Sequence, residues 1–210
     1  MELNNIKCVI FDFDCTLYSN GDESREDEYF AKFFNENNIK YSSMEDVYKK
    51  YPSFHKMQAT LAYARDMNFD DNLFFDYVDK NIFDVTSPNI QVINQELVYE
   101  LAKYYDLYVL SDSNESYLDY YYKLFNIDKS VFKRSISNEY RREDMSKAPY
   151  MREILAFGKY KADEILMVGD SYEFDIIPAN RVGIKSQMVN HVSDTEKLIL
   201  DLIKLAKESN

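Results

Sequence analysis

The sequence predicts an α/β protein, in which a Rossmann-like parallel sheet is sandwiched by helices and carries a small all-helical insertion. Three short apolar runs, each ending abruptly in polar residues, predict buried parallel strands at Cys8 to Phe13, Leu107 to Leu110 and Ile165 to Val168. Helical patterns alternate with these runs, which is typical of a parallel sheet covered on both faces. Residues 19–87 break the alternation with helical patterns only, which predicts the insertion.

The insertion follows directly after the first predicted strand. Turn-rich segments mark its borders, SNGD at the start and TSPN at the end. We expect residues 1–18 and 88–210 to form the core domain and residues 19–87 to form the insertion. Apolar residues at helical spacing predict four helices within it, at Glu26 to Asn37, Met44 to Tyr51, Phe54 to Met67 and Asn72 to Phe83.

Helices separate the remaining strands of the core. A fourth strand is expected at Ile184 to Val189, after the turn residue Gly183. The C-terminal segment Asp194 to Lys207 is amphipathic, which predicts a helix packed on the sheet. The other core helices are expected at Gln91 to Tyr104, Glu115 to Phe125, Pro149 to Phe157 and Asp175 to Arg181.

Composition and charge limit the class of partner. The formal net charge of −12 makes the average surface repel nucleic-acid phosphate, so we expect a small substrate and no nucleic acid. No apolar run approaches the roughly 20 residues of a membrane span, and the N-terminus lacks the pattern of a signal peptide. We therefore expect a cytoplasmic protein with no membrane partner. Cys8 and Cys15 are too few for a disulfide framework or a four-ligand zinc site.

Asp12 and Asp14 stand two residues apart at the end of the first predicted strand. Alternate residues of a strand point to the same side, so both carboxylates face one spot and repel each other unless a cation lies between them. Mg²⁺ prefers such oxygen ligands and leaves positions for water and phosphate. An ionised aspartate can attack phosphorus without a helper base, while a second carboxyl group moves the proton of the leaving oxygen. The pattern predicts these two roles, although an isolated DxD pair is also typical of solvated carboxylates.

Further polar residues follow the later strands. Ser111 ends the second strand, where a hydroxyl group can hold phosphate oxygens, and Lys147 precedes a helix and can pair with phosphate and with Asp12. Asp170 ends the third strand as a further acidic ligand, and Asp175 follows it near the next helix. The carboxyl ends of parallel strands meet at one edge of the sheet, so we expect these residues to surround one site.

The order DxDxT, Ser, Lys and GDSxxxxD resembles the haloacid dehalogenase-like phosphohydrolase superfamily, over about Val9 to Val189. The resemblance implies a magnesium-dependent phosphatase, with the helical insertion as a cap that closes over a small phosphorylated metabolite. It also implies the roles of individual residues: Asp12 as nucleophile, Asp14 as general acid and base, Ser111 and Lys147 as phosphate binders, and Asp12, the Asp14 main chain, Asp170 and Asp175 as the metal site.

Two positions depart from the pattern of the superfamily. Asp112 stands in the substrate-binding loop where family members often have Asn, so its carboxylate must point away or meet the metal or a base. Pro149 comes one residue later than the Lys-Pro pair that family members often have at Lys147. Neither departure breaks the catalytic set, and Asp14 favours phosphoryl transfer over carbon–halogen cleavage.

The start FDFDCTLY with an all-helical cap is similar to pyrimidine 5′-nucleotidase-like members, which implies a nucleoside monophosphate as substrate. The same framework serves sugar phosphates and phosphoglycolate. A phosphomutase is an alternative, and a phosphometabolite-binding protein without turnover is disfavoured because every catalytic position is filled. Side chains that are candidates for substrate contacts are Tyr18, Asn20, His55, Lys56, Gln58 and Arg65 in or near the cap, and Arg141 and Arg142 before Lys147.

Overall fold

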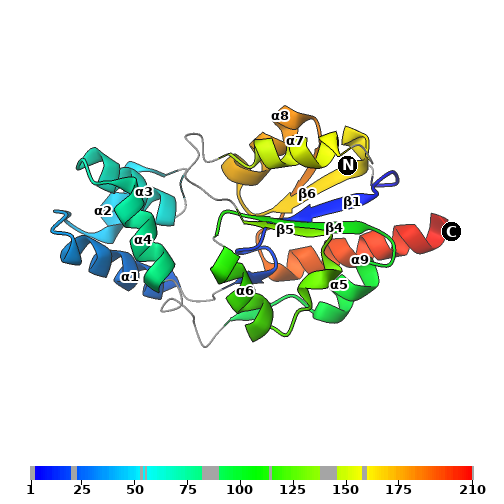
Figure 1. The fold of residues 1–210 in the computed structure, drawn as a ribbon, viewed down its shortest axis with the longest axis horizontal. Helices are drawn as coiled ribbons and strands as arrows, with labels where there is room; N and C mark the ends of the chain where they lie inside the picture. Colours follow the sequence, from blue (N-terminus) through cyan, green and yellow to red (C-terminus); the bar gives the residue numbers. More distant parts are fainter. Residues whose placement is uncertain are drawn as a thin grey trace. The chain divides into compact units, whose positions relative to one another are not determined.

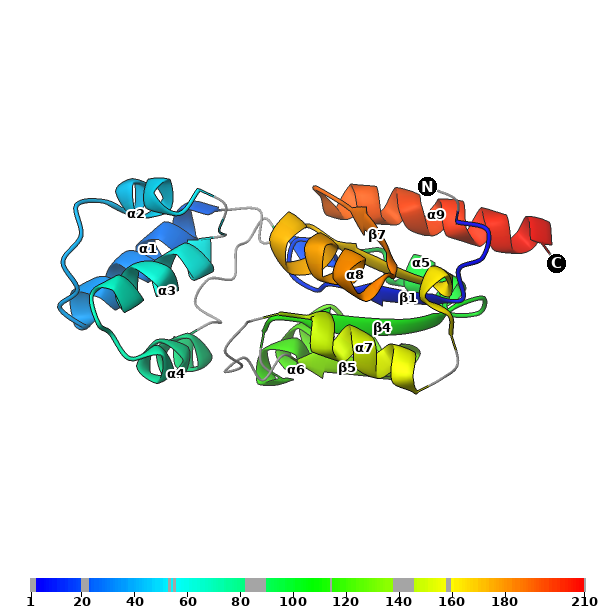
Figure 2. The same cartoon turned by 90° about the horizontal axis from the view of Figure 1, so that it is seen from above.

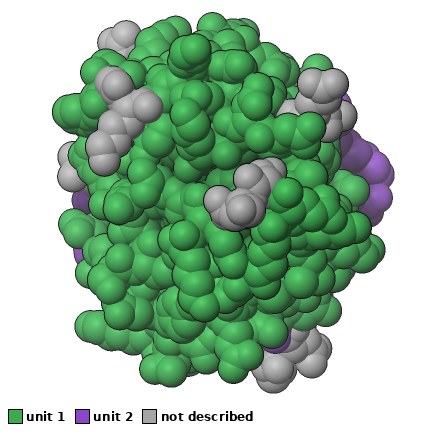
Figure 3. Space-filling model, turned by 90° about the vertical axis from the view of Figure 1, so that its right-hand side faces the viewer, with its two compact units in different colours: residues 1–19, 91–210 green, residues 20–90 purple. Residues whose placement is uncertain are grey.

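The chain divides into two compact units, Met1–Ser19 with Gln91–Asn210 and Asn20–Ile90, which Figure 1 shows as ribbons and Figure 3 in separate colours. The first unit contains the sheet, and the second is the helical insertion. The computed structural model describes residues 3–19, 23–52, 54, 56–81, 90–113, 115–137, 146–157 and 160–209.

A five-stranded parallel sheet forms the centre of the first unit, in the order β5-β4-β1-β6-β7. β1 lies in the middle, with Val9 opposite Leu107 on one side and Leu166 on the other. The α/β class and the parallel sheet predicted from the sequence are confirmed. The strands are β1 (Cys8–Phe11), β4 (Asp106–Ser111), β5 (Arg134–Ser137), β6 (Ile165–Gly169) and β7 (Lys185–Met188).

Within the five-stranded sheet, edge strand β5 was not predicted from the sequence. Its sequence RSIS offers one buried apolar side chain, Ile136, because an edge strand pairs on one side only and buries less of its length. β5 pairs with β4 in parallel register, with Ser137 opposite Ser111. A central strand such as β1, in contrast, is buried at all four positions and reads as a continuous apolar run.

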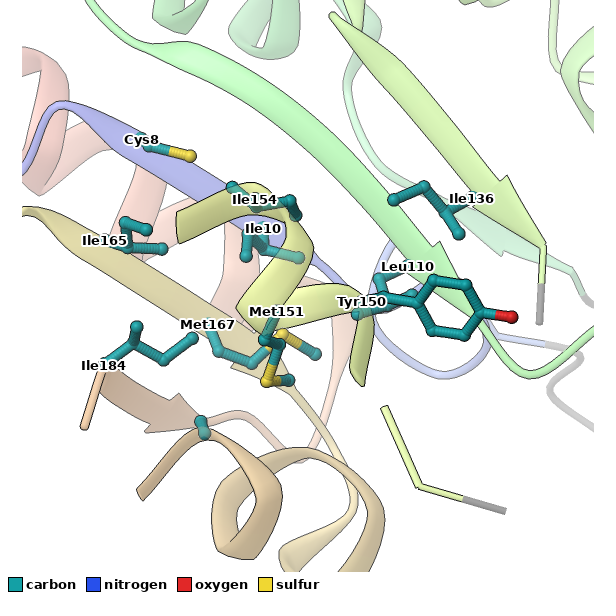
Figure 4. Packing of buried hydrophobic residues seen from close by; sticks show 11 residues of the cluster. Cys8, Ile10, Leu110, Ile136, Tyr150, Met151, Ile154, Ile165, Met167 and Ile184 are labelled. Atoms are coloured by element: carbon teal, nitrogen blue, oxygen red, sulfur yellow. The ribbon is translucent and has the colours of Figure 1, made fainter. Parts of the chain in front are cut away.

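Helices cover both faces of the sheet (Figures 1 and 2). Residues Cys8 and Ile10 of β1 point to the face that carries α7 and α8, where they pack with Met151 and Ile154 of α7 and Met167 of β6 (Figure 4). Alternate residues of β1 point to the opposite face, which carries the other core helices. The core helices are α5 (Gln95–Leu101), α6 (Glu115–Leu124), α7 (Ala148–Ala156), α8 (Ile177–Val182) and α9 (Val192–Ser209).

Two core helices differ most from their predicted boundaries at the N-terminal end. The segment from Gln91 begins with the short strand β3 (Gln91–Val92), which pairs antiparallel with β2 (Tyr18–Ser19), and α5 starts only at Gln95. The insertion therefore leaves and rejoins the core through two adjacent strands. The helix expected from Asp175 begins earlier as a π-helical turn, Tyr172–Ile176, and continues as α8.

The described residues of the insertion form four helices built around aromatic side chains. Phe33, Phe34 and Phe74 are fully buried, and the ring of Phe33 contacts that of Phe74 edge to face at 5.1 Å between centroids. Across the described parts of both units, no helix has the length and apolarity required for a membrane span. The four helices are α1 (Glu23–Glu36), α2 (Met44–Lys50), α3 (Lys56–Asp66) and α4 (Asp71–Asn81).

Candidate active site

A tight turn after β1 places the first two carboxylates. The carbonyl of Phe13 accepts hydrogen bonds from the backbone N–H groups of Thr16, Leu17 and Tyr18, at 3.4, 2.9 and 3.4 Å. The Asp12 N–H group still belongs to the sheet, since it donates to the Val168 carbonyl of β6 at 2.8 Å. Asp12 thus stands at the carboxyl edge of the central strand.

Lys147 joins Asp12 to the segment that follows β6. Its Nζ atom lies 2.6 Å from Asp12 Oδ1 and 2.6 Å from Asp175 Oδ1, and the lysine is 2% exposed. Burial alone would lower the pKa of Lys147, but Asp12, Asp175 and Asp112 raise it well above the usual range. The ammonium group therefore stays charged in a position that water barely reaches.

Three carboxylates form a group that can hold a metal ion. Asp12, Asp170 and Asp175 each offer one oxygen, and these atoms lie within 4.8 Å of one another. Asp175 can approach the others because residue 169 is a glycine: a Cβ atom at this position would lie 2.2 Å from Asp175 Oδ2 and clash with it. Asp175 is further oriented by the Ser171 N–H group, which donates to Oδ2 at 3.0 Å. All three donors are hard oxygen ligands, so the set fits Mg²⁺.

The charge of Asp12 shows why a cation suits this position. Burial raises the pKa of Asp12 well above its usual range, Lys147 opposes that rise, and Asp175 and Asp170 add to it. Within the described site, Lys147 provides the ammonium that faces these carboxylates. A divalent cation would lower the cost of keeping them all ionised.

Asp14 is surrounded by hydroxyl groups. Its Oδ1 atom accepts hydrogen bonds from Tyr117 at 2.7 Å and from Tyr18 at 2.5 Å. Its Oδ2 atom accepts from Ser113 at 2.9 Å and from Ser111 at 3.5 Å. Burial raises the pKa of Asp14, and the hydrogen bonds from Tyr117 and Ser113 partly offset that rise. A raised pKa suits a carboxyl group that has to carry a proton.

The end of β4 supplies Ser111 and Asp112. Ser111 is fully buried, and its Oγ atom accepts a hydrogen bond from the Ser113 N–H group at 2.9 Å. The Asp112 side chain is 16% exposed, and its Oδ2 atom lies 4.0 Å from Lys147 Nζ. Of the two alternatives open for this carboxylate, pointing away or meeting a cation, the structure therefore shows the second.

A sequence model of the haloacid dehalogenase-like hydrolases matches residues 9–189. The chain belongs to this family. Solved structures share the fold of the hydrolase, while no curated protein matches it by sequence.

Three of these structures cover most of the hydrolase. The HAD-hydrolase YfnB of Bacillus subtilis, bound to magnesium, is 15% identical with a TM-score of 0.61, covering 93% of this chain and 99% of its own. A predicted phosphatase from Clostridium acetobutylicum is 18% identical with a TM-score of 0.61 over 93% and 99% of the two chains. A predicted phosphoglycolate phosphatase from Haemophilus somnus is 20% identical with a TM-score of 0.59 over 87% and 84%.

The sequence patterns did not predict two side chains that contact Asp14, Tyr117 and Ser113. Tyr117 belongs to the tyrosine-rich stretch YLDYYY of α6, where helical spacing indicates core packing and does not single out one hydroxyl group. Ser113 follows Asp112 directly, and its place in the loop after β4 was the available signal.

The candidate substrate contacts have mixed outcomes. Tyr18 bonds to Asp14, as described above. Inside the insertion Lys56 pairs with Asp27 at 2.9 Å, and Arg65 binds Asp71 through Nε and Nη2. Gln58 is buried, with 9% exposed. The remaining candidates lie outside the described residues: Asn20, His55, Arg141 and Arg142.

Proposed function

We propose that this hydrolase is a magnesium-dependent phosphomonoesterase that acts on a small phosphorylated metabolite through an aspartyl-phosphate at Asp12. The observation that carries the proposal is the position of Lys147, with its ammonium 2.6 Å from Asp12 and 2.6 Å from Asp175. One cation thereby joins the proposed nucleophile to the acidic group after β6. A phosphate group bound beside Asp12 would meet this ammonium and the Ser111 hydroxyl.

In the first step, an Asp12 oxygen forms a bond to phosphorus as the bond from phosphorus to the leaving oxygen breaks. Asp14 gives its proton to that leaving oxygen, which departs as an alcohol. Lys147 and Ser111 hold the other phosphate oxygens and offset their charge. Magnesium, held by Asp12, Asp170 and Asp175 and by the Asp14 main chain, would screen the charge of Asp12 from that of the phosphate.

In the second step, water attacks the phosphorus of the aspartyl-phosphate. Asp14, now ionised, takes a proton from that water as the bond between phosphorus and the Asp12 oxygen breaks. Inorganic phosphate is released, and both carboxyl groups return to their starting state. Asp14 thus serves as acid and then as base, which requires an environment in which both protonation states are accessible.

The decisive test is hydrolysis of p-nitrophenyl phosphate by the wild type and by Asp12→Asn. We expect turnover in Mg²⁺, its loss in EDTA, and a fall of about a thousandfold or more in Asp12→Asn. Asp201→Asn, at an exposed position of α9, is the matched control and should keep wild-type rates. Near-normal turnover by Asp12→Asn would refute the mechanism.

The substrate we propose first is a nucleoside monophosphate, with sugar phosphates and phosphoglycolate as further members of the test panel. One structurally similar protein is a predicted phosphoglycolate phosphatase, which supports including that compound. Release of inorganic phosphate from the panel identifies the substrate.

A phosphomutase would instead return the phosphoryl group to an organic product. Formation of isomerised phosphate esters without free phosphate would therefore show that the enzyme is a mutase and not a hydrolase. We propose that the helical insertion acts as the cap that selects among these compounds.

A further inference from the structure

The two oxygens of the Asp14 carboxylate have separate sets of partners. Oδ1 accepts hydrogen bonds from two phenol groups, Tyr117 at 2.7 Å and Tyr18 at 2.5 Å. Oδ2 faces two serine hydroxyls, Ser113 at 2.9 Å and Ser111 at 3.5 Å. The two phenol oxygens also contact each other. The carboxyl group is therefore fixed in its rotation, and its two oxygens have different surroundings.

The two tyrosines come from distant parts of the chain and are held by packing. Tyr18 lies on β2 and Tyr117 on α6, and each is 4% exposed. The Tyr18 ring stacks on Tyr121 at 4.6 Å between centroids, and the Tyr117 ring meets Tyr121 edge to face at 4.5 Å. Phe13, which precedes Asp14, contacts the Tyr18 ring at 5.3 Å. Such contacts leave the rings little freedom, so the hydroxyl groups stay aimed at one oxygen atom.

Both oxygens of Asp14 accept two hydrogen bonds, but the donors differ in their freedom to turn. The phenols on Oδ1 are held by ring packing, whereas the serine hydroxyls on Oδ2 can rotate and accept a hydrogen bond in place of donating one, so a proton carried by Asp14 belongs on Oδ2. Oδ2 is the oxygen on the Ser111 side, and Ser111 is the residue proposed to hold phosphate. A proton on Oδ2 is thus already directed to the side where the leaving oxygen would lie, which saves reorientation in the transition state.

We propose that Tyr117 and Tyr18 are positioning residues that fix the Asp14 carboxyl group and dedicate Oδ2 to proton transfer. The inference rests on the proposed function, because it requires Asp14 to protonate a leaving group. In that step the Oδ2–H bond breaks and its proton goes to the leaving oxygen, while phosphorus loses its bond to that oxygen and gains a bond to an Asp12 oxygen. Removing one phenol leaves Asp14 in place but takes away one of the two hydrogen bonds that hold Oδ1.

The test compares two aryl phosphates that differ in how much their leaving groups need a proton. p-Nitrophenolate departs readily without one, whereas phenolate is more basic and depends on the acid. The measured quantity is kcat/KM, which reports the step that breaks the ester bond when that step is the first irreversible one. We expect Tyr117→Phe to lower kcat/KM for phenyl phosphate about tenfold more than for p-nitrophenyl phosphate.

Tyr122→Phe is the matched control. Tyr122 belongs to the same helix and is 3% exposed, but its hydroxyl group pairs with Ser135 Oγ at 2.7 Å. A merely structural loss should lower kcat/KM equally for both substrates, and we expect Tyr122→Phe to show that equal effect or none. Tyr18→Phe should repeat the selective loss and replaces Tyr117→Phe if that variant does not fold.

The outcomes separate the positioning role from the proposed function. An active wild type with an inactive Asp12→Asn variant and a selective loss in Tyr117→Phe or Tyr18→Phe supports the inference. Equal losses for both aryl phosphates in these variants, or no loss, would overturn the positioning role and leave the function intact. A wild type that hydrolyses neither ester, or an Asp12→Asn variant as fast as the wild type, would overturn both.

Discussion

At the scale of single residues, the site is a balance between closely spaced carboxylates and one buried ammonium. Lys147 lies between Asp12 and Asp175 and is also 4.0 Å from Asp112. Each carboxylate beside this lysine offsets part of its positive charge and so weakens its attraction for a bound anion. Asp112 is the member of the group that is neither the proposed nucleophile nor part of the metal triad, so its charge can be removed without touching those functions.

Asp112→Asn is expected to tighten anion binding. Loss of a negative charge beside Lys147 should lower the inhibition constant of inorganic phosphate by about three- to tenfold, since partial exposure screens the charge. Phosphate inhibition of p-nitrophenyl phosphate turnover measures the effect. Asp119→Asn, on α6 and paired with Lys129 at 2.7 Å, removes an equal charge away from the site and should leave the constant unchanged. Weaker phosphate inhibition in Asp112→Asn would show that Asp112 supports the anion site.

At the scale of elements, the site depends on where the strands end. β6 ends at Gly169, and the π-helical turn Tyr172–Ile176 then brings Asp175 back against the strand. Helix α7 begins at Ala148, directly after Lys147, with Pro149 in its first turn, a position that tolerates proline. The shift of this proline relative to the family pattern therefore leaves the helix start and the position of Lys147 intact.

Gly169→Ala is expected to damage both stability and metal binding. The added Cβ atom would lie 2.2 Å from Asp175 Oδ2, so Asp175 has to move, at a cost of about 1–3 kcal/mol in unfolding free energy. Denaturant unfolding and Mg²⁺ titration measure the two effects. Gly183→Ala is the control, because its φ of 84° makes alanine costly while the nearest side chain is 4.0 Å away. It should lower stability by about 1 kcal/mol and leave Mg²⁺ affinity unchanged. Wild-type Mg²⁺ affinity in Gly169→Ala would show that the close approach of Asp175 to Gly169 is not required for metal binding.

The insertion should respond to changes in its aromatic core. Phe33 is fully buried and contacts Phe34, Phe69, Phe74 and Tyr77 through its ring. Phe33→Ala is expected to lower the unfolding free energy by about 3–5 kcal/mol, because it leaves a cavity. Calorimetry or denaturant unfolding measures the loss. Leu73→Ala changes a side chain of the same unit that is 54% exposed and should cost well under 1 kcal/mol.

At the scale of the whole molecule, a metal ion bound by the acidic triad would link its binding to folding. Burial raises the pKa of Asp12 in the metal-free protein, so folding there becomes less favourable as the pH rises through the range in which Asp12 ionises. A cation that binds the ionised triad reverses this penalty. Protons and the cation compete for the same oxygens, and the raised pKa places that competition at higher pH than for an ordinary aspartate.

Mg²⁺ should therefore raise the Tm, and more at neutral pH than near pH 5. At a concentration about 100-fold above Kd the stabilisation is about 2.7 kcal/mol, which corresponds to about 5–10 °C for a chain of this length. Thermal unfolding with Mg²⁺ and with EDTA measures it. Asp170→Asn should abolish the shift, whereas Asp201→Asn should retain it. A shift of equal size at both pH values would argue against binding to the triad.

The amino-acid sequence was enough to predict the alternation of strands and helices, because burial imposes a continuous apolar run on β1 and β6 and an amphipathic pattern on the helices. It also determined which polar residues stand at strand ends, since those runs stop abruptly at Asp12, Ser111 and Asp170. Strand β5 was not predicted because its sequence RSIS contains a single apolar residue, Ile136, whereas the other edge strand, β7, is flanked by the apolar residues Ile184 and Val189. The hydrogen-bond partners within the site, in contrast, depend on how distant segments pack together. Tyr117 and Asp14 are 103 positions apart, and their contact follows from how α6 packs beside the turn after β1. No local pattern records that distance, because periodicity encodes which face is buried and not which distant side chain it meets.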